Sequence, residues 1–156
     1  MFIHKSVFPM TDPSSNAEWV TNLGAEDAFV LYNTKGEYQG AQYTEEDEGF
    51  GLTAGRTTGA SHEFTFEVLG VNITSGGVAK NMEWAEAMTR AQGEYYAGFV
   101  TGNLDLFLTT QPVRTLMTNT NPQSKKDDQV FTGTVKWEDM ALMSRYDAPV
   151  ITYEPA

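Results

Sequence analysis

The stretch that decides the fold is Ser61–Ile73, which reads SHEFTFEVLGVNI. Phe64, Phe66 and Val68 alternate with polar residues, which is the period-two pattern of a strand with one buried face and one solvated face. After Gly70 the apolar positions move from even to odd numbers, and this change of phase predicts a bulge or a bend. The stretch predicts a half-buried strand around which the rest of the chain can be arranged.

A second clean alternation covers residues 129–138, with threonine, lysine and glutamate at the outward positions. Its inward positions are Phe131, Gly133, Val135 and Trp137. Because the two stretches share one period, we expect residues 129–138 to be the sheet partner of residues 61–73.

An apolar stripe at helical spacing runs between these two strands. Trp84, Met88 and Tyr95 fall on one side of a 3.6-residue period, and Asn81 is a suitable N-cap. The pattern predicts one packed α-helix over about residues 81–97. Strands before and after a single helix indicate an α+β domain, mainly an antiparallel β-sandwich or open barrel, with extended termini.

Several other segments have a turn or loop composition. Ala28–Tyr32, the turn 33–36 and residues 37–44 predict a hairpin. The glycine-rich segment 45–60 predicts a mobile or extended loop, and the polar segment 119–128 predicts a solvated or interaction loop.

The first 24 residues mix apolar side chains with prolines and a Ser-Ser-Asn cluster, and no period persists for long. Such a leader either packs back onto its own domain or lies on another subunit. We assign residues 1–24 as an N-terminal arm and residues 25–156 as a single β-rich domain.

Charge and cysteine content exclude several classes of function. The chain has 156 residues, 10 Lys and Arg, 21 Asp and Glu and no cysteine, with a net charge of −11. The acidic balance argues against nonspecific nucleic-acid or membrane binding, and the lack of cysteine removes thiol catalysis and thiolate zinc sites. Since no apolar run has the ~20 residues of a membrane span and Met1–Lys5 does not resemble a secretory signal, we expect synthesis in the cytosol.

Binding motifs for cofactors fail on spacing. Gly55-Arg56-Thr57 resembles the end of a phosphate-binding loop, but Phe50 stands where that loop needs glycine. The acidic run 45–48 lacks the every-second-residue ligand spacing of calcium loops, and His4 and His62 are too few for a zinc motif. No cofactor or metal is expected.

Catalytic motifs are equally sparse. Ser61 and His62 are chain neighbours that point to opposite faces of a strand, so they do not form a nucleophile–base pair. A pair of distant carboxylates for glycoside hydrolysis leaves no local pattern and stays open. Core packing is the favoured role for Trp84 and Trp137, with sugar stacking as the alternative.

The layout of residues 25–153 resembles that of bacteriophage virion components. It is similar in size and in its strands–helix–strands order to the tail-tube family, and less closely to capsid-decoration proteins. The resemblance implies a non-enzymatic structural subunit that assembles into rings or tubes in the virion, with copies of itself and other virion proteins as partners. The alternatives are a capsid-decoration protein and a β module that binds carbohydrate or a small ligand.

Under this resemblance the subunit contacts come from residues 1–24, the loop 45–60 and the loop 119–128. The candidate contact residues are Phe2, Ile3, Phe8, Trp19, Phe50, Arg56, Lys125 and Lys126. Sheet edges are expected to be sealed by strand addition between subunits, and no specific nucleic-acid or membrane binding is expected.

Overall fold

The computed structural model describes residues 1–31, 34–46, 56–69, 89–120 and 130–151. In chain order the elements are β1 (Phe2–His4), the 3-10 turn η1 (Lys5–Val7), α1 (Asn16–Gly24), β2 (Ala28–Phe29), β3 (Thr34–Glu46), β4 (Arg56–Leu69), β5 (Tyr95–Val100), β6 (Asp105–Leu108), β7 (Arg114–Thr120), β8 (Val130–Glu138) and β9 (Ser144–Asp147).

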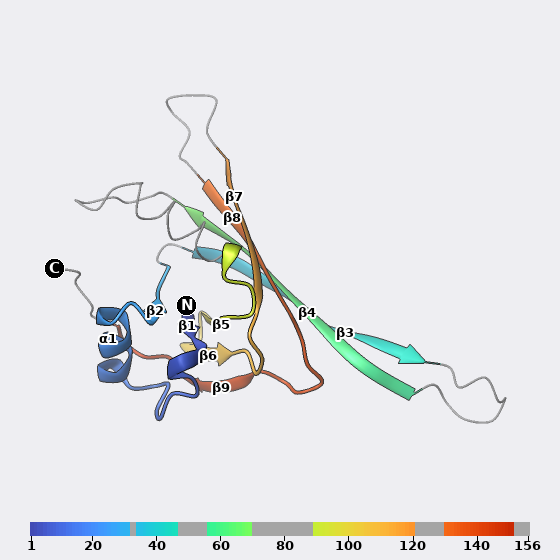
Figure 1. Ribbon diagram of the computed structural model, residues 1–156, viewed down its shortest axis with the longest axis horizontal. Coiled ribbons are helices and arrows are strands. Elements are labelled where there is room, and N and C mark those ends of the chain that lie inside the picture. Colours follow the sequence, from blue (N-terminus) through green and yellow to red (C-terminus); the bar gives the residue numbers. More distant parts are fainter. Residues whose placement is uncertain (32–33, 47–55, 70–88, 121–129, 152–156) are drawn as a thin grey trace.

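The strands form two antiparallel sheets. One has five strands in the order β2-β1-β5-β6-β9, and the other has four in the order β3-β4-β8-β7. Helix α1 lies on the side of the five-stranded sheet that faces away from the other sheet (Figure 1). The expected α+β class with mainly antiparallel sheet is confirmed. No helix among the described residues is long and apolar enough to cross a bilayer.

Alternate residues of the five-stranded sheet build two separate cores. Phe2 packs towards the four-stranded sheet with Phe66 and Trp137, while the next residue, Ile3, packs with Trp19 of α1 and Leu106 of β6. A strand with apolar residues on both faces belongs in a middle layer. The domain is therefore a sandwich of two sheets with a helix on the outside of one sheet.

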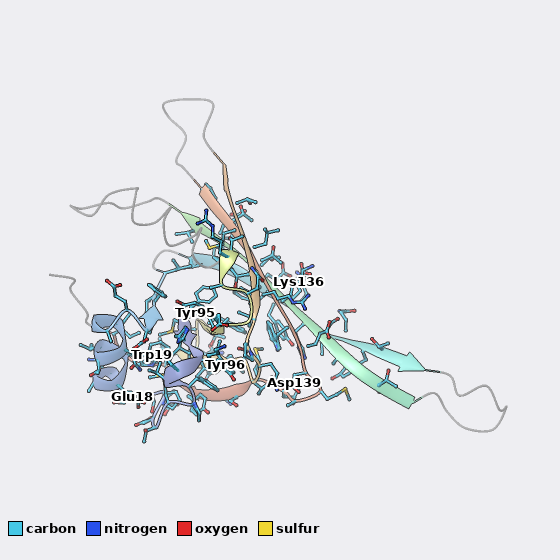
Figure 2. All side chains as sticks on the ribbon, in the orientation of Figure 1. Glu18, Trp19, Tyr95, Tyr96, Lys136 and Asp139 are labelled. Carbon is cyan, nitrogen blue, oxygen red and sulfur yellow. The ribbon has the colours of Figure 1, made fainter. Side chains whose placement is uncertain are left out.

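Residues 1–24 are part of the domain, so the expected arm is corrected. β1 pairs with β2 on one side and β5 on the other. Helix α1 is capped by Ser15, whose side chain accepts a hydrogen bond from the Glu18 amide, while the Glu18 carboxylate accepts from the amides of Thr11 and Asp12. Trp19 is fully buried, and Figure 2 shows it beside α1. The leader packs inward because β1, which is buried on both faces, and the amphipathic helix α1 bury apolar surface together.

The expected hairpin over residues 28–44 is wrong. β2 belongs to the five-stranded sheet, whereas β3 pairs with β4 in the other sheet. Gly36 lies inside β3 and is not part of a turn. A Cβ at this position would lie 2.5 Å from the Phe64 ring and 2.9 Å from the Thr65 carbonyl, so only glycine fits. Close approach of a ring is the reason for a glycine in this strand.

The predicted helix over 81–97 is contradicted at its C-terminal end. Thr89 and Arg90 are helical, Gly93 has a φ of +75°, and β5 begins at Tyr95. Tyr95–Val100 is apolar on both faces, as expected for a strand between two cores. Residues 81–88 lie outside the described residues.

The pairing of the two alternating stretches is confirmed. β4 and β8 pair antiparallel from Ser61 opposite Glu138 to Leu69 opposite Val130. β4 begins at Arg56, so part of the expected loop 45–60 is strand. The change of phase after Gly70 and the segments 47–55 and 121–129 lie outside the described residues.

Candidate functional site

The outer face of the four-stranded sheet is polar and its charges are unevenly distributed. Glu63 of β4 lies opposite Lys136 of β8, with 2.9 Å between carboxylate and ammonium, and Lys136 lies opposite Arg114 of β7. Towards β3 the same face has Lys35 opposite Glu67, and Glu37 opposite Thr65. Figure 2 shows Lys136 on the side of this sheet away from α1. On this face β7 therefore contributes the cation Arg114, whereas β3 contributes one charge of each sign, Lys35 and Glu37.

One edge of this sheet is open. β3 has 13 residues and pairs with β4 along one side, while no strand in the described part of the chain lies along its other side. Its register is irregular after Tyr38 and after Thr44, and Gly40 has a φ of +80°. An edge of this length presents a row of unpaired N–H and C=O groups to a further strand.

The opposite edge, on β7, is partly covered by the segment before β5. The Val113 amide donates to the Tyr95 carbonyl at 2.8 Å, and the Gly93 amide donates to the Val113 carbonyl at 3.1 Å. Further along, Nε2 of Gln92 donates to the Thr115 carbonyl at 2.8 Å. The two edges of one sheet are thus chemically different.

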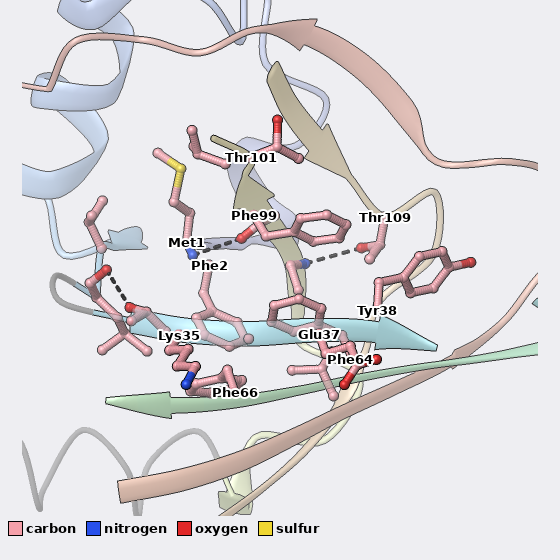
Figure 3. Close-up of a pocket in the computed structure, with 18 of the residues that line it drawn as sticks. Met1, Phe2, Lys35, Glu37, Tyr38, Phe64, Phe66, Phe99, Thr101 and Thr109 are labelled. Carbon is pink, nitrogen blue, oxygen red and sulfur yellow. Dashed lines mark hydrogen bonds between the residues drawn. The ribbon is translucent and has the colours of Figure 1, made fainter. Parts of the chain in front are cut away.

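A cleft of about 890 Å³ lies between the two sheets and is bounded on one side by Thr34–Tyr38 of β3. Aromatic rings form much of its lining: Figure 3 shows Phe2, Tyr38, Phe64, Phe66 and Phe99. Trp137 also lines the cleft. The amino group of Met1 donates to the Gly98 carbonyl at 2.8 Å, and burial lowers the pKa of this amine to about 5. The lining is mainly aromatic and apolar, with Lys35, Glu37 and Thr101 among its polar residues.

His62 is buried beside the cleft with both ring nitrogens bonded. Nδ1 lies 2.6 Å from the Tyr38 hydroxyl and Nε2 lies 2.8 Å from the Asp139 carbonyl. Because a carbonyl only accepts, Nε2 donates and Nδ1 accepts from Tyr38 in the neutral ring. Burial, and next the charge of Tyr43, raise the pKa of Tyr38. This arrangement is that of a satisfied core histidine.

Two of the site types considered from the sequence can be checked in the described residues, a serine–histidine pair and a metal site. Ser61 is exposed and His62 is buried, so the expected opposite orientation of these neighbours is confirmed. No three His, Asp or Glu side chains converge as metal ligands within the ranges that the structure describes. The side chains of the acidic run 45–48 lie outside those ranges.

Three of the predicted contact residues are corrected to core residues. Phe2, Ile3 and Trp19 are each at most 2% exposed, because they fill the two cores on either side of β1. Phe8 is half-buried, and its ring stacks on Tyr96 with centroids 3.7 Å apart. These four side chains pack within their own chain.

The structure does not describe the side chains of the other four predicted contact residues. The Arg56 backbone pairs with Glu46 at the start of β4. The Arg56 side chain and residues Phe50, Lys125 and Lys126 lie outside the described residues.

The sequence did not predict the open edge of β3 or the covered edge of β7. The length of β3 was hidden because Asn33–Gly36 has turn composition. The role of Gln92 depends on a neighbour 23 positions away, which no local pattern reveals. No protein-family model, curated protein or solved structure matches the chain.

Proposed function

We propose that the protein is a non-enzymatic structural subunit of a virion that assembles into rings or tubes by continuing its four-stranded sheet from one copy to the next. The observation that carries the proposal is the 13-residue open edge of β3 on a sheet with one polar face. Copies of the same chain and other virion proteins are the proposed partners, without a cofactor.

The strand directions suit repetition. All neighbours in the order β3-β4-β8-β7 are antiparallel, so the two edge strands run in opposite directions. A second copy related by rotation about an axis along the strands brings its β7 antiparallel to β3 of the first copy. Such head-to-tail contacts generate closed rings when the rotation closes.

The charges favour the same pairing. On the polar face β3 has Lys35 and Glu37 and β7 has Arg114, so the opposite charges that can meet at this contact are Glu37 and Arg114. Opposite charges on two joining edges guide encounter and disfavour the wrong pairing of like edges.

Assembly is tested by mass photometry and negative-stain microscopy over a wide range of concentration. We expect rings, tubes or discrete oligomers for the natural chain. The double variant Glu37→Lys, Gln42→Lys makes the exposed β3 edge basic and should prevent assembly without unfolding the monomer. The control Glu26→Lys makes the same kind of charge change beyond α1, away from both edges.

A natural chain that stays monomeric at all concentrations contradicts the proposal. So does assembly of the β3 double variant at the same concentration as the natural chain, because the edge would then play no part.

The aromatic cleft favours a second candidate function, a β module for a small apolar ligand. Binding would bring a ligand close to Trp137, which lines the cleft. A titration with a hydrophobic dye, followed by tryptophan fluorescence, tests this candidate separately from assembly. Saturable binding by a monomer that never assembles would favour the ligand-binding function.

A further inference from the structure

The edge of β7 is occupied at alternate residues by groups of the same chain. Val113, Thr115 and Met117 direct backbone groups away from β8, and each of the three has a hydrogen bond with the segment that precedes β5 or with the first residue of β5. Alternation at every second residue is the pattern with which a neighbouring strand would bond to this edge.

Two of these positions are covered by side chains. Gln92 Nε2 donates to the Thr115 carbonyl at 2.8 Å, and the Met117 amide donates to the Thr89 hydroxyl at 3.4 Å. Only Val113 bonds to backbone, through Gly93 and Tyr95. A new strand on this edge requires the turn 89–92 to move, because the short Thr89 side chain holds its backbone close to β7. This turn bonds to Thr115 and Met117 through two side chains, so it is easier to remove than a paired strand would be.

The β3 edge has no comparable cover in the described residues. Its hydrogen bond outside the β3–β4 pair is the local one from the Thr34 hydroxyl to the Leu31 carbonyl. A chain that leaves one edge open and closes the other with side chains cannot join β3 to β7 of another copy until those side chains move.

We propose that Thr89 and Gln92 form a releasable cover on the β7 edge, and that β3 of a second copy replaces them during assembly. This inference rests on the proposed function. The exchange replaces bonds to side chains with bonds to a strand backbone at Thr115 and Met117. The cover keeps newly made chains apart and sets the concentration at which they join.

The test compares the assembly of Gln92→Ala with that of the natural chain. Gln92→Ala removes the donor to the Thr115 carbonyl, so the midpoint concentration of assembly should fall on the order of fivefold, as expected for one net hydrogen bond. Gln92→Glu places an acceptor against that carbonyl and should lower the midpoint at least as far. Asn22→Ala, which removes an amide from α1, serves as the control.

Amide hydrogen exchange supplies a second readout in the monomer. The Met117 amide should exchange faster in Gln92→Ala than in the natural chain, while the Ile3 amide in the buried β1 strand should be unchanged. A thermal melt confirms that each variant is folded.

The outcomes separate this inference from the proposed function. In one outcome the natural chain and Gln92→Ala assemble at the same midpoint concentration and exchange the Met117 amide at the same rate. This result would contradict the proposed cover and leave the assembly function in place. If no variant assembles at any concentration, both the function and the cover are contradicted.

Discussion

The imidazole of His62 lies almost parallel to the indole of Trp137, with 5.0 Å between ring centroids and 4° between planes. The Tyr38 ring is stacked near both. These three side chains come from β4, β8 and β3, so one stack joins three strands of the four-stranded sheet. His62 is 3% exposed and both of its nitrogens are bonded.

Replacing His62 with alanine should lower the free energy of unfolding by about 2–4 kcal/mol, because it leaves a cavity and deprives the Asp139 carbonyl of its donor. His62→Phe keeps the stack and loses the hydrogen bonds, so its loss should be smaller. Urea unfolding followed by circular dichroism measures both values. Equal losses in the two variants would show that the ring stack contributes little.

A methyl group at Gly133 should destabilise the domain by about 1–3 kcal/mol. An added Cβ would lie 2.2 Å from the Phe66 ring, which is itself buried between the sheets and has little room to move. Gly59→Ala is the matched control in the same sheet, since nothing lies within 4 Å of its Cβ position. Thermal melts of the two variants should differ by several degrees, and similar melting temperatures would contradict the close packing at Gly133.

Removal of residues 1–24 should abolish cooperative unfolding. The deletion takes away β1, a middle strand of the five-stranded sheet, together with Trp19 and its bond from Nε1 to the Pro13 carbonyl at 2.8 Å. Trp19→Ala alone should cost about 3–5 kcal/mol. Differential scanning calorimetry measures both, and a sharp transition in the truncated chain would restore the interpretation of these residues as an arm.

Asp139 should make stability depend on acid pH. The Ala141 amide and then the Thr110 hydroxyl lower the pKa of its carboxyl below the ordinary 3.8. A lowered carboxyl pKa stabilises the fold at pH values above the unfolded pKa, and the contribution is lost as pH falls through the folded pKa. The difference in unfolding free energy between the natural chain and Asp139→Asn should therefore be largest near neutral pH and shrink below pH 3.8. A difference that is constant with pH would contradict this role.

The pairing of β4 with β8 was predictable because each strand has one solvated face and one buried face. Phe66 and Val135 alternate with Glu67 and Lys136, and the sheet simply places these alternations side by side. A period of two survives in the sequence wherever one face is buried and the other is solvated.

The five-stranded sheet was harder to predict because it is covered on both faces. In β5 one core contains Tyr95, Ala97 and Phe99, and the other contains Tyr96. The strand therefore lacks an alternation of polar and apolar residues, and its first residues also fitted the helical spacing of the predicted helix. Helix α1 did leave a local signal, because Ser15 and Glu18 match the Ser-x-x-Glu pattern that is typical of a helix start. Its buried side is short, so hydrophobic periodicity alone did not reveal it.

The candidate site depends on which strands form the edges of the four-stranded sheet. The sequence of a strand does not reveal whether it is an edge strand, because this depends on pairing between distant segments. The sequence of β3 contains Gly36, Tyr38 and Gly40, which are compatible with an edge, a bulge or a turn. Pairing with β4 on one side only, and the reach of Gln92 to Thr115, are properties of the assembled chain.

The ring contacts between the sheets also give the protein an optical signal of its own. Phe107 stacks on Phe99, Phe99 stacks on Phe64 at 4.7 Å, and Tyr38 links Phe99 to Trp137. This series crosses from the five-stranded sheet to the four-stranded sheet. Near-ultraviolet circular dichroism, which depends on the mutual orientation of aromatic rings, will therefore report the spacing of the two sheets independently of their strand content.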